Sequence, residues 1–224
     1  NEDDDIRNFE MMTQEAVMNL NRIPNDQNTC YLTHYVDGEW RGSLDKSKEY
    51  EVWNPSTGSV SCKLIKGDKD VIDAAVEAAH KAQATWGSTS AQQRAAILEK
   101  AAGLLRERAD TLGLLESCDV GKPIQLAKKL DIPRAAENFE FYARMIRTDS
   151  TSAHHMADAV NITQRSPVGV SALITPWNLP IYLLSWKVAP ALACGNTVVV
   201  KPSELTPLTA TALASVLEDA GLPK

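Results

Sequence analysis

The sequence lacks the residue patterns that typically bind metal ions. Its four cysteines, Cys30, Cys62, Cys118 and Cys194, form no C-x-x-C pair, and its four histidines form no H-E-x-x-H motif. We therefore expect no metal site. Because a chain of 224 residues can bury a core without disulfide bonds, we expect reduced thiols and a cytoplasmic location.

The sequence also lacks a membrane span, a signal-peptide start and a basic patch. The longest apolar run, residues 179–194, is interrupted by Ser185, Lys187 and Pro190 and is too short to cross a bilayer. The chain begins NEDDD, whereas a signal peptide begins with positive charge. Its lysines and arginines are scattered, and the net charge is −6. These absences argue against a membrane or a nucleic acid as partner.

A G-x-G-x-x-G dinucleotide-binding loop is absent as well. The most informative pattern is instead two buried strands, 168–174 and 197–201, joined by an apolar helical stretch. Polar clusters end both strands, TPWN at 175–178 and KPSE at 201–204. With a helix at 207–220, the order strand–helix–strand–helix is half of a doubly wound sheet. Ligands of such sheets bind at the carboxyl ends of the strands.

Local signals upstream predict short β elements followed by helices. Asp37-Gly38 is a hairpin turn within 35–40, and a second turn at 54–58 precedes a strand at 59–65. Apolar spacing predicts helices at 69–84, at 109–119 and from Pro133 through Ile146. A capping box of Ser90 and Gln93 predicts the start of another helix between the first two. A last helix is predicted at 207–220, with Thr206 as its N-cap and Gly221 just after its end.

Two polar segments interrupt this order. Residues 1–30 are acidic, with a short amphipathic helix expected at 9–20, and we interpret them as a tail or arm. Residues 148–158 break the helical pattern, and 159–166 alternate as an exposed strand. The adjacent His154 and His155 are expected on the surface, because neighbouring side chains of an extended segment point apart.

The stretch from Arg165 to Glu204 strongly resembles the aldehyde dehydrogenase superfamily, as do the earlier segments VDGEW, WNPSTG, GKP and DIPRAAENF. The resemblance covers residues 33–224 and is most specific for the 2-aminomuconic semialdehyde dehydrogenase branch. Betaine-aldehyde, hydroxymuconic-semialdehyde and retinal dehydrogenases remain open. It implies an α/β fold, namely a partial doubly wound (Rossmann-like) cofactor-binding domain of the aldehyde dehydrogenase fold, with N-terminal β hairpins and helices.

The resemblance also implies partners and a division of the chain. We expect NAD as cofactor, a small-molecule aldehyde as substrate, and a homo-oligomer, either dimer or tetramer. The expected parts are an acidic N-terminal extension at 1–30, the N-terminal part of the cofactor-binding domain at 31–147, an oligomerisation arm at 148–166, and the first half of the NAD-binding sheet at 167–224, with the catalytic domain absent.

Asn178 is the candidate catalytic residue, and two roles are open for it. By position it is an N-cap for the helix that begins at Pro180. By its match to the superfamily's asparagine motif, its side-chain amide is a neutral donor to the oxyanion that forms when a thiolate attacks an aldehyde. The two roles are compatible.

The expected cofactor-binding residues follow the two strands. Lys201 alone reads as a strand-end lysine reaching solvent, but K-P-S-E matches the superfamily's ribose-binding motif. Lys201 and Glu204 are then expected at the adenosine ribose, and a carboxylate there favours NAD over NADP. The full expected set comprises Ile174, Thr175, Pro176, Trp177, Asn178, Lys201, Ser203 and Glu204.

The reaction that the resemblance implies is NAD-dependent oxidation of an aldehyde, a semialdehyde such as 2-aminomuconic semialdehyde, to a carboxylic acid. Cys194 lies between an apolar helix and a strand, and we expect it to be a buried structural thiol and not the nucleophile. The superfamily's cysteine nucleophile and general-base glutamate are expected beyond Lys224. The alternatives are an inactive truncated form with a structural or interaction role, and a free-standing NAD-binding module.

Overall fold

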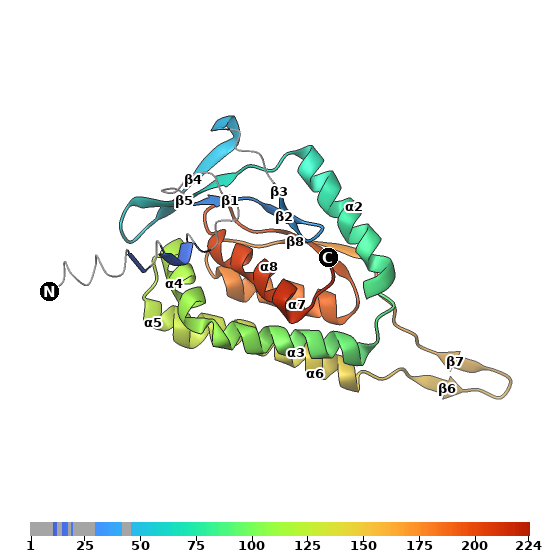
Figure 1. Cartoon of the computed structure of the whole chain (residues 1–224). Helices are drawn as coiled ribbons and strands as arrows, with labels where there is room; N and C mark the ends of the chain where they lie inside the picture. Colours follow the sequence, from blue (N-terminus) through green and yellow to red (C-terminus); the bar gives the residue numbers. More distant parts are fainter. Residues whose placement is uncertain (1–10, 13–14, 18, 20–29, 42–45) are drawn as a thin grey trace.

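The computed structural model describes residues 11–12, 15–17, 19, 30–41 and 46–224, which form an α/β body with one projecting hairpin (Figure 1). The acidic residues at 2–5 lie outside this part. Of the helix expected at 9–20, residues 11–12 and 15–17 are helical. Ala16 and Val17 are buried in the main core, so this part of the expected tail packs against the body.

The N-terminal strands confirm the predicted turns. They are β1 (Tyr31–Leu32), β2 (His34–Val36), β3 (Glu39–Arg41), β4 (Glu49–Asn54) and β5 (Ser59–Ile65), with the 3-10 turn η1 (Lys46–Lys48) before β4. β2 and β3 form the expected antiparallel hairpin. Asp37 (φ 55°) and Gly38 (φ 72°) both adopt the left-handed conformation that a two-residue hairpin turn requires. β4 and β1 flank β5 in a separate three-stranded sheet.

The main helices are α2 (Lys69–Trp86), α3 (Ala91–Glu107), α4 (Ala109–Val120), α5 (Ile124–Leu126), α6 (Ile132–Thr148), α7 (Pro180–Ala193) and α8 (Leu208–Ala220). Local capping residues mark the starts of α2 and α3 and the ends of α4 and α8. Both hydrogen bonds of the Ser90–Gln93 capping box are present at the start of α3. The left-handed residues Gly121 and Gly221 end α4 and α8. None of the described helices is long and apolar enough to cross a membrane.

The local predictions were incomplete before α6 and wrong at the start of α8. The short α5 and the π-helical turn η2 (Ala127–Asp131) precede α6 and were not anticipated. Thr206 does not cap α8: Pro207 occupies the N-cap position with no side-chain hydrogen bond. Instead, the Asp119 carboxylate at the end of α4 accepts a hydrogen bond from the backbone N–H of Leu208. A distant side chain has therefore replaced the local cap.

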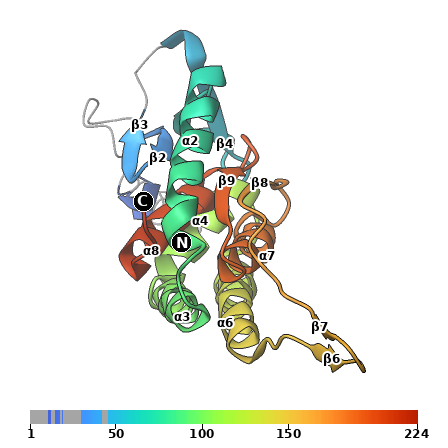
Figure 2. The ribbon, with the colours of Figure 1, turned by 90° about the vertical axis from the view of Figure 1, so that its right-hand side faces the viewer.

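The carboxyl-terminal part is a parallel strand pair covered by two layers of helices. β8 (Val170–Ile174) and β9 (Thr197–Lys201) pair in parallel, as the strand–helix–strand pattern predicted. Figure 2 shows α8 lying over α3 and α7 over α6, and the buried apolar side chains of these four helices belong to one core. The strands themselves are less buried than expected, because Thr197 is the one buried residue of β8 and β9. Val168, at the start of the predicted first strand, is 96% exposed.

Helix α2 attaches this pair to the rest of the body. The Gln83 side chain accepts from Thr197 N (2.8 Å) and donates to Gly195 O (2.9 Å). The indole of Trp86 donates to Leu192 O (3.2 Å) from a buried position. These bonds join residues more than a hundred positions apart in sequence, and through them α2 holds β9 and the end of α7 in place.

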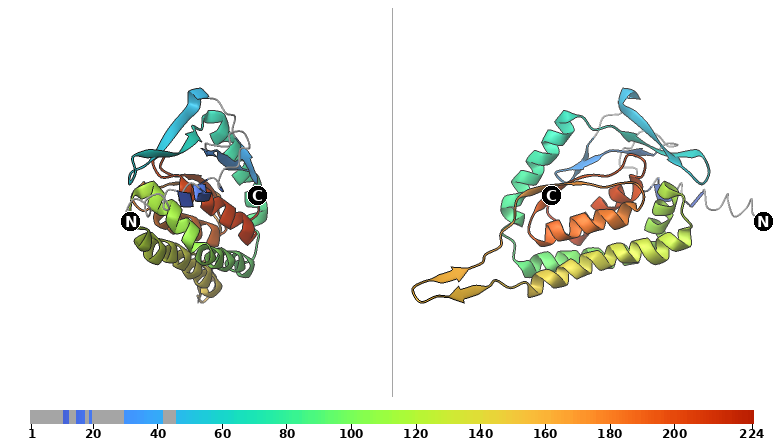
Figure 3. Two further views of the ribbon diagram at one scale, coloured as in Figure 1. Left: turned by 60° about the vertical axis from the view of Figure 1, so that its left-hand side comes forward. Right: turned by 180° about the vertical axis from the view of Figure 1, so that it is seen from behind.

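Residues 153–162 form the hairpin that leaves the body. β6 (Ala153–His155) pairs antiparallel with β7 (Val160–Ile162), and the views in Figure 1 and Figure 3 agree that it extends away from all helices. Of the strand expected at 159–166, only residues 160–162 are a strand, and β6 was not anticipated in so polar a segment. His154 and His155 are exposed, as expected. Met156, Val160 and Ile162 are also more than half exposed.

Candidate functional site

The two polar clusters singled out in the sequence lie at the same edge of the β8–β9 pair. Ile174 is the register partner of Lys201, so both strands end at the same level. Beyond them, Thr175 N donates to Lys201 O (3.2 Å) and extends the contact between the two loops. The parallel register thus brings residues 174–178 and 201–204 together, although they are separated by the whole of α7.

Within this edge, some of the expected cofactor residues are accessible and others are structural. Ile174, Pro176, Trp177, Lys201 and Glu204 are exposed. Thr175 and Ser203 are buried. The Ser203 hydroxyl accepts from Leu205 N (3.2 Å) and so shapes the second loop. The roles of these eight residues toward NAD remain predictions.

Lys201 and Glu204 form an ion pair at the mouth of the site. Their Nζ and Oε2 atoms are 2.8 Å apart, and both side chains are more than half exposed. The hydrogen bond from Lys201 lowers the pKa of Glu204, so Glu204 is an ionised acceptor at neutral pH. An exposed pair of this kind contributes little to stability. It does present a cationic donor and an anionic acceptor side by side.

Asn178 is exposed and stands immediately before α7. Its expected role as an N-cap is wrong, because Leu179 is the N-cap residue and no side chain in the cap position makes a hydrogen bond. The amide of Asn178 is consequently not committed to capping. Its alternative role as an oxyanion donor stays a prediction.

Two buried carboxylates of α4 lie directly beneath these loops, and the sequence analysis missed them. Glu116 is fully buried and its Oε2 accepts from Thr209 Oγ1 (2.8 Å) and Ile181 N (3.4 Å). Asp119, 4% exposed, accepts from Leu208 N (2.9 Å). The two residues are three positions apart on α4. Glu116 bonds to the starts of both α7 and α8, whereas Asp119 bonds to the start of α8.

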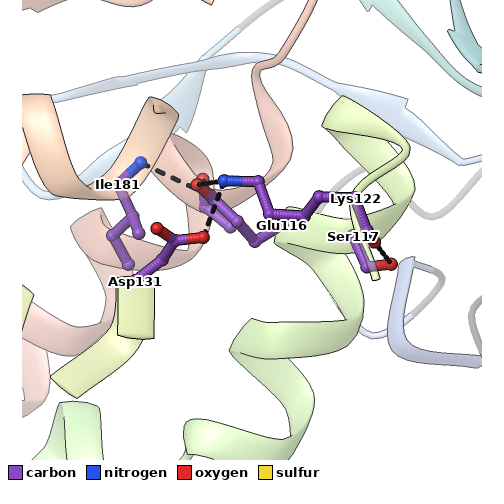
Figure 4. A network of polar contacts seen from close by, with 6 residues as sticks. Glu116, Ser117, Lys122, Asp131 and Ile181 are labelled. Carbon is purple, nitrogen blue, oxygen red and sulfur yellow. Dashed lines mark hydrogen bonds and ion pairs between the residues drawn. The ribbon is translucent and has the colours of Figure 1, made fainter. Parts of the chain in front are cut away.

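Burial dominates the electrostatics of both carboxylates. It raises the pKa of Glu116 to about 7, against the hydrogen bond from Thr209 and the charge of Lys122, which lower it. Burial likewise raises the pKa of Asp119 well above its usual range, and the charge of Glu116 raises it further. Figure 4 shows Lys122 between Glu116 and Asp131, with Nζ–O distances of 3.8 Å and 2.6 Å.

A pocket of about 260 Å³ opens beside Trp177. Its walls come from β4, the end of α4 and both loops of the site, and they include Asp119, Leu205 and Thr206. Among the described residues, Asp119 Oδ1 and Thr206 Oγ1 are buried without a hydrogen-bond partner. No group of three or more His, Cys, Asp or Glu side chains in that part of the chain could hold a metal ion.

An aromatic face of α7 begins one turn beyond Asn178. The rings of Tyr182 and Trp186 lie 4.8 Å apart. The guanidinium of Arg134, from the first turn of α6, lies 5.4 Å from the centre of the Tyr182 ring. Arg134 is exposed and forms no ion pair with any residue that the structure describes. The sequence analysis did not single out this arginine, because α6 and α7 meet only in the folded chain.

Cys194 corrects another expectation. It is exposed at the carboxyl end of α7 and not buried, whereas Cys30, Cys62 and Cys118 are buried free thiols. The apolar helix that suggested burial ends one residue earlier, at Ala193. Cys194 also lies at the opposite end of α7 from Asn178, so it is remote from the oxyanion candidate along the helix axis.

Comparison with known proteins agrees with this geometry. The model of the aldehyde dehydrogenase family matches residues 40–224. Human 2-aminomuconic semialdehyde dehydrogenase is 44% identical over 200 residues, covering 86% of this chain and 39% of that protein. The chain therefore spans about two fifths of the length of the curated relatives it matches.

Solved structures give the same result. The betaine aldehyde dehydrogenase of Staphylococcus aureus in complex with NAD+ superposes with a TM-score of 0.86 at 30% identity, over 96% of this chain and 41% of that one. PnpE in complex with nicotinamide adenine dinucleotide superposes with a TM-score of 0.82 at 35% identity, over 86% of this chain and 39% of that one. With the match to most of its length, the chain belongs to the aldehyde dehydrogenase family.

Proposed function

We propose that the protein carrying this chain oxidises an aldehyde to a carboxylic acid with NAD as the hydride acceptor. The observation that carries the proposal is the register pairing of Ile174 with Lys201, which sets Asn178 and the Lys201–Glu204 pair at one sheet edge. Membership of the aldehyde dehydrogenase family and the NAD complexes of two similar structures support it.

The residues at this edge fit the ribose of a dinucleotide. The Lys201 ammonium group can donate to a ribose hydroxyl and the Glu204 carboxylate can accept from one, and both are exposed. A carboxylate at this place repels the 2′-phosphate of NADP, which favours NAD. NAD, when bound, supplies the acceptor for the hydride. Trp177, exposed beside the pocket, offers an apolar wall to the cofactor.

Asn178 serves the reaction as a hydrogen-bond donor. A tetrahedral intermediate places negative charge on the former aldehyde oxygen, and a neutral amide donor stabilises that charge more than the uncharged carbonyl. Because Asn178 is exposed and is not used as a helix cap, its amide is available to the substrate.

The substrate is proposed to be a semialdehyde that also bears a carboxylate, such as 2-aminomuconic semialdehyde. Several relatives above 40% identity are named for such substrates. The guanidinium of Arg134 pairs with no carboxylate that the structure describes, and its position over the ring of Tyr182 supports the same choice. Arginine pairs with a carboxylate through two parallel hydrogen bonds, so it would orient the acid end while the aldehyde reaches Asn178.

The test uses the full-length protein with 2-hydroxymuconic semialdehyde and, for comparison, betaine aldehyde, with NADH formation as the readout. We expect Arg134→Met to lower kcat/KM for the acidic substrate by about tenfold to a hundredfold, the usual cost of a charged hydrogen-bonded contact, and to leave betaine aldehyde nearly unchanged. The matched control is Arg144→Met, which alters an exposed arginine of the same helix that already pairs with Glu140. Equal losses on both substrates would refute the assignment of Arg134.

The cofactor assignment has a separate test. Lys201→Met should raise the KM for NAD several-fold and barely change the melting temperature, since exposed ion pairs contribute little stability. Lys48→Met removes a comparable half-exposed ion pair, with Asp68, between η1 and the start of α2, and should leave the KM unchanged. Absence of NAD reduction with every aldehyde would favour the alternative of a catalytically inactive structural or interaction protein.

The β6–β7 hairpin is proposed to be the contact between subunits of a homo-oligomer. It leaves the body and exposes the apolar side chains of Met156, Val160 and Ile162 to solvent. Exposed apolar side chains that lie together are typical of a protein–protein contact surface. Val160→Asp with Ile162→Asp should shift the full-length protein to a smaller species in sedimentation analysis. An unchanged mass would exclude the hairpin as the contact.

A further inference from the structure

Helix α7 starts without a cap of its own, although it carries the candidate oxyanion donor at its entrance. The first N–H groups of any helix have no partner within that helix and need one from outside. Leu179 occupies the N-cap position and offers no side-chain acceptor. The acceptor comes from α4 instead, where Glu116 Oε2 lies 3.4 Å from Ile181 N. Ile181 is the third residue after Asn178.

The same oxygen also accepts from α8. Thr209 Oγ1 donates to Glu116 Oε2 at 2.8 Å, in the first turn of the helix that follows the Lys201–Glu204 loop. A single carboxylate oxygen thus contacts the helices that follow both loops of the site. Helix α8 has a second acceptor of its own, because Asp119 accepts from Leu208 N. Among the described side chains, only Glu116 accepts a hydrogen bond from the first turn of α7.

Glu116 is itself held in place. Its side chain is fully buried, and its second oxygen lies 3.8 Å from Lys122 Nζ, which is hydrogen-bonded to Asp131 Oδ2 at 2.6 Å (Figure 4). Ser117 Oγ donates to Lys122 O at 2.6 Å and fixes the turn that carries Lys122. Because the protein interior is closely packed, these neighbours restrict the Glu116 carboxylate to one position, and its hydrogen bond with Ile181 N then fixes the start of α7.

We propose that Glu116 is a positioning residue for aldehyde oxidation, holding the entrance of α7 so that the Asn178 amide meets the developing oxyanion. The inference rests on the proposed function. Displacement of a catalytic group by about 1 Å can cost a hundredfold in rate. Glu116 therefore acts on turnover through Asn178, and it acts less on NAD binding, since Asp119 holds α8 independently.

Three variants of the full-length protein, compared with one control, separate this role from simple support of the fold. Glu116→Met keeps the volume and removes the acceptor, and we expect kcat to fall tenfold to a hundredfold with the KM for NAD within about threefold. Glu116→Gln keeps an oxygen that can accept from Ile181 N and Thr209 Oγ1, so kcat should stay within about threefold. Thr209→Val removes only the α8 contact and should also stay near wild type.

The matched control is Ser185→Ala on α7. Ser185 is equally buried, accepts a hydrogen bond from Asn138 at 2.8 Å and donates one to Tyr182 O at 2.7 Å, but it contacts none of the orphan N–H groups at the helix start. Losing these two bonds should lower the melting temperature without lowering kcat. If Ser185→Ala and Glu116→Met reduce kcat alike, disturbance of α7 anywhere is enough and the specific role of Glu116 is refuted.

The decisive measurement is a double-mutant cycle with Asn178→Ala. Removing an oxyanion donor lowers kcat about a hundredfold to a thousandfold. If Glu116 acts through Asn178, Glu116→Met should then change kcat by less than about threefold in the Asn178→Ala background. Equal factors in both backgrounds would overturn the proposal. Should Glu116→Met not fold, Glu116→Asp serves in the same cycle, since it withdraws the carboxylate by one methylene and should lower kcat three- to tenfold.

The cycle also distinguishes failure of this inference from failure of the proposed function. If Asn178→Ala alone leaves kcat unchanged, Asn178 is not the oxyanion donor, and both the function assigned to it and the role of Glu116 are wrong. If Asn178→Ala lowers kcat as expected while Glu116→Met is additive, the proposed function stands and only the positioning role is lost.

Discussion

Replacing Glu116 by glutamine should make the protein more resistant to unfolding above neutral pH, although it removes a charged group from an ion-pair network. Glu116 is fully buried, and burial raises its pKa from 4.5 to about 7. The groups facing it are Thr209 and Ile181, which donate to it, Lys122, which lowers its pKa, and Asp131, which raises it. On balance the folded protein binds this proton more tightly than the unfolded chain does.

The sign and size of the effect follow from linkage. A carboxyl whose pKa is higher in the folded state contributes stability that is fully present below pH 4.5, and that stability is lost as the pH rises through about 7. The difference between the two pKa values corresponds to roughly 3 kcal/mol of unfolding free energy. Glutamine does not titrate, so the variant escapes this loss. The charge of Glu116 also raises the pKa of Asp119, so the variant removes this repulsion too, which widens the stability gap at high pH in the same direction.

The assay is urea unfolding of wild type and Glu116→Gln side by side between pH 5 and 8. Near pH 5 the two midpoints should nearly coincide, and by pH 8 the variant should unfold at clearly higher urea. A gap that does not change with pH, or a wild type that gains on the variant as the pH rises, would refute the reasoning. Either result would mean that Lys122 and the two hydrogen bonds outweigh burial at this site.

Two further predictions concern the scaffold. Gly121→Ala should destabilise the protein by roughly 2–4 kcal/mol, because Gly121 has φ 75° and an added Cβ would lie 2.8 Å from Pro55 Cγ. The control Gly58→Ala, at φ 68° with open space around it, should lower the unfolding free energy only by the backbone strain of roughly 1–2 kcal/mol. Equal urea midpoints for the two variants would contradict the clash with Pro55. Trp86→Phe should cost roughly 1–3 kcal/mol, since it leaves the buried Leu192 carbonyl without the indole donor at 3.2 Å; an unchanged midpoint would mean that another group replaces that donor.

Local sequence chemistry accounts for much of the fold. The Asp37-Gly38 turn, the Ser90–Gln93 capping box and the left-handed glycines at 121 and 221 were readable because each depends on neighbours within four or five positions. The parallel β8–α7–β9 unit was readable for the same reason, since its alternating apolar and polar segments are contiguous. Signals of short range survive in any one sequence and need no knowledge of the tertiary structure.

Side-chain environment was harder to predict than element type. Cys194 was expected to be buried because it follows an apolar helix, but that helix ends one residue before it and the thiol is exposed. The predicted first strand begins with Val168, which is 96% exposed in spite of its apolar surroundings in sequence. Hydropathy reports the average preference of a segment, whereas exposure depends on which other element covers each residue.

The sequence by itself determined the family, the strand–helix–strand unit and the two polar clusters, because motif residues and local periodicity are properties of contiguous stretches. Only the tertiary structure revealed that Glu116 and Asp119, expected neither as caps nor as site residues, complete α7 and α8 from 65 and 89 positions away. It also brought Arg134 to Tyr182 and left Asn178 free of the capping role. The physical reason is that an orphan helix N–H donates to whichever acceptor oxygen the fold presents to it, and packing, not proximity along the chain, decides which oxygen that is.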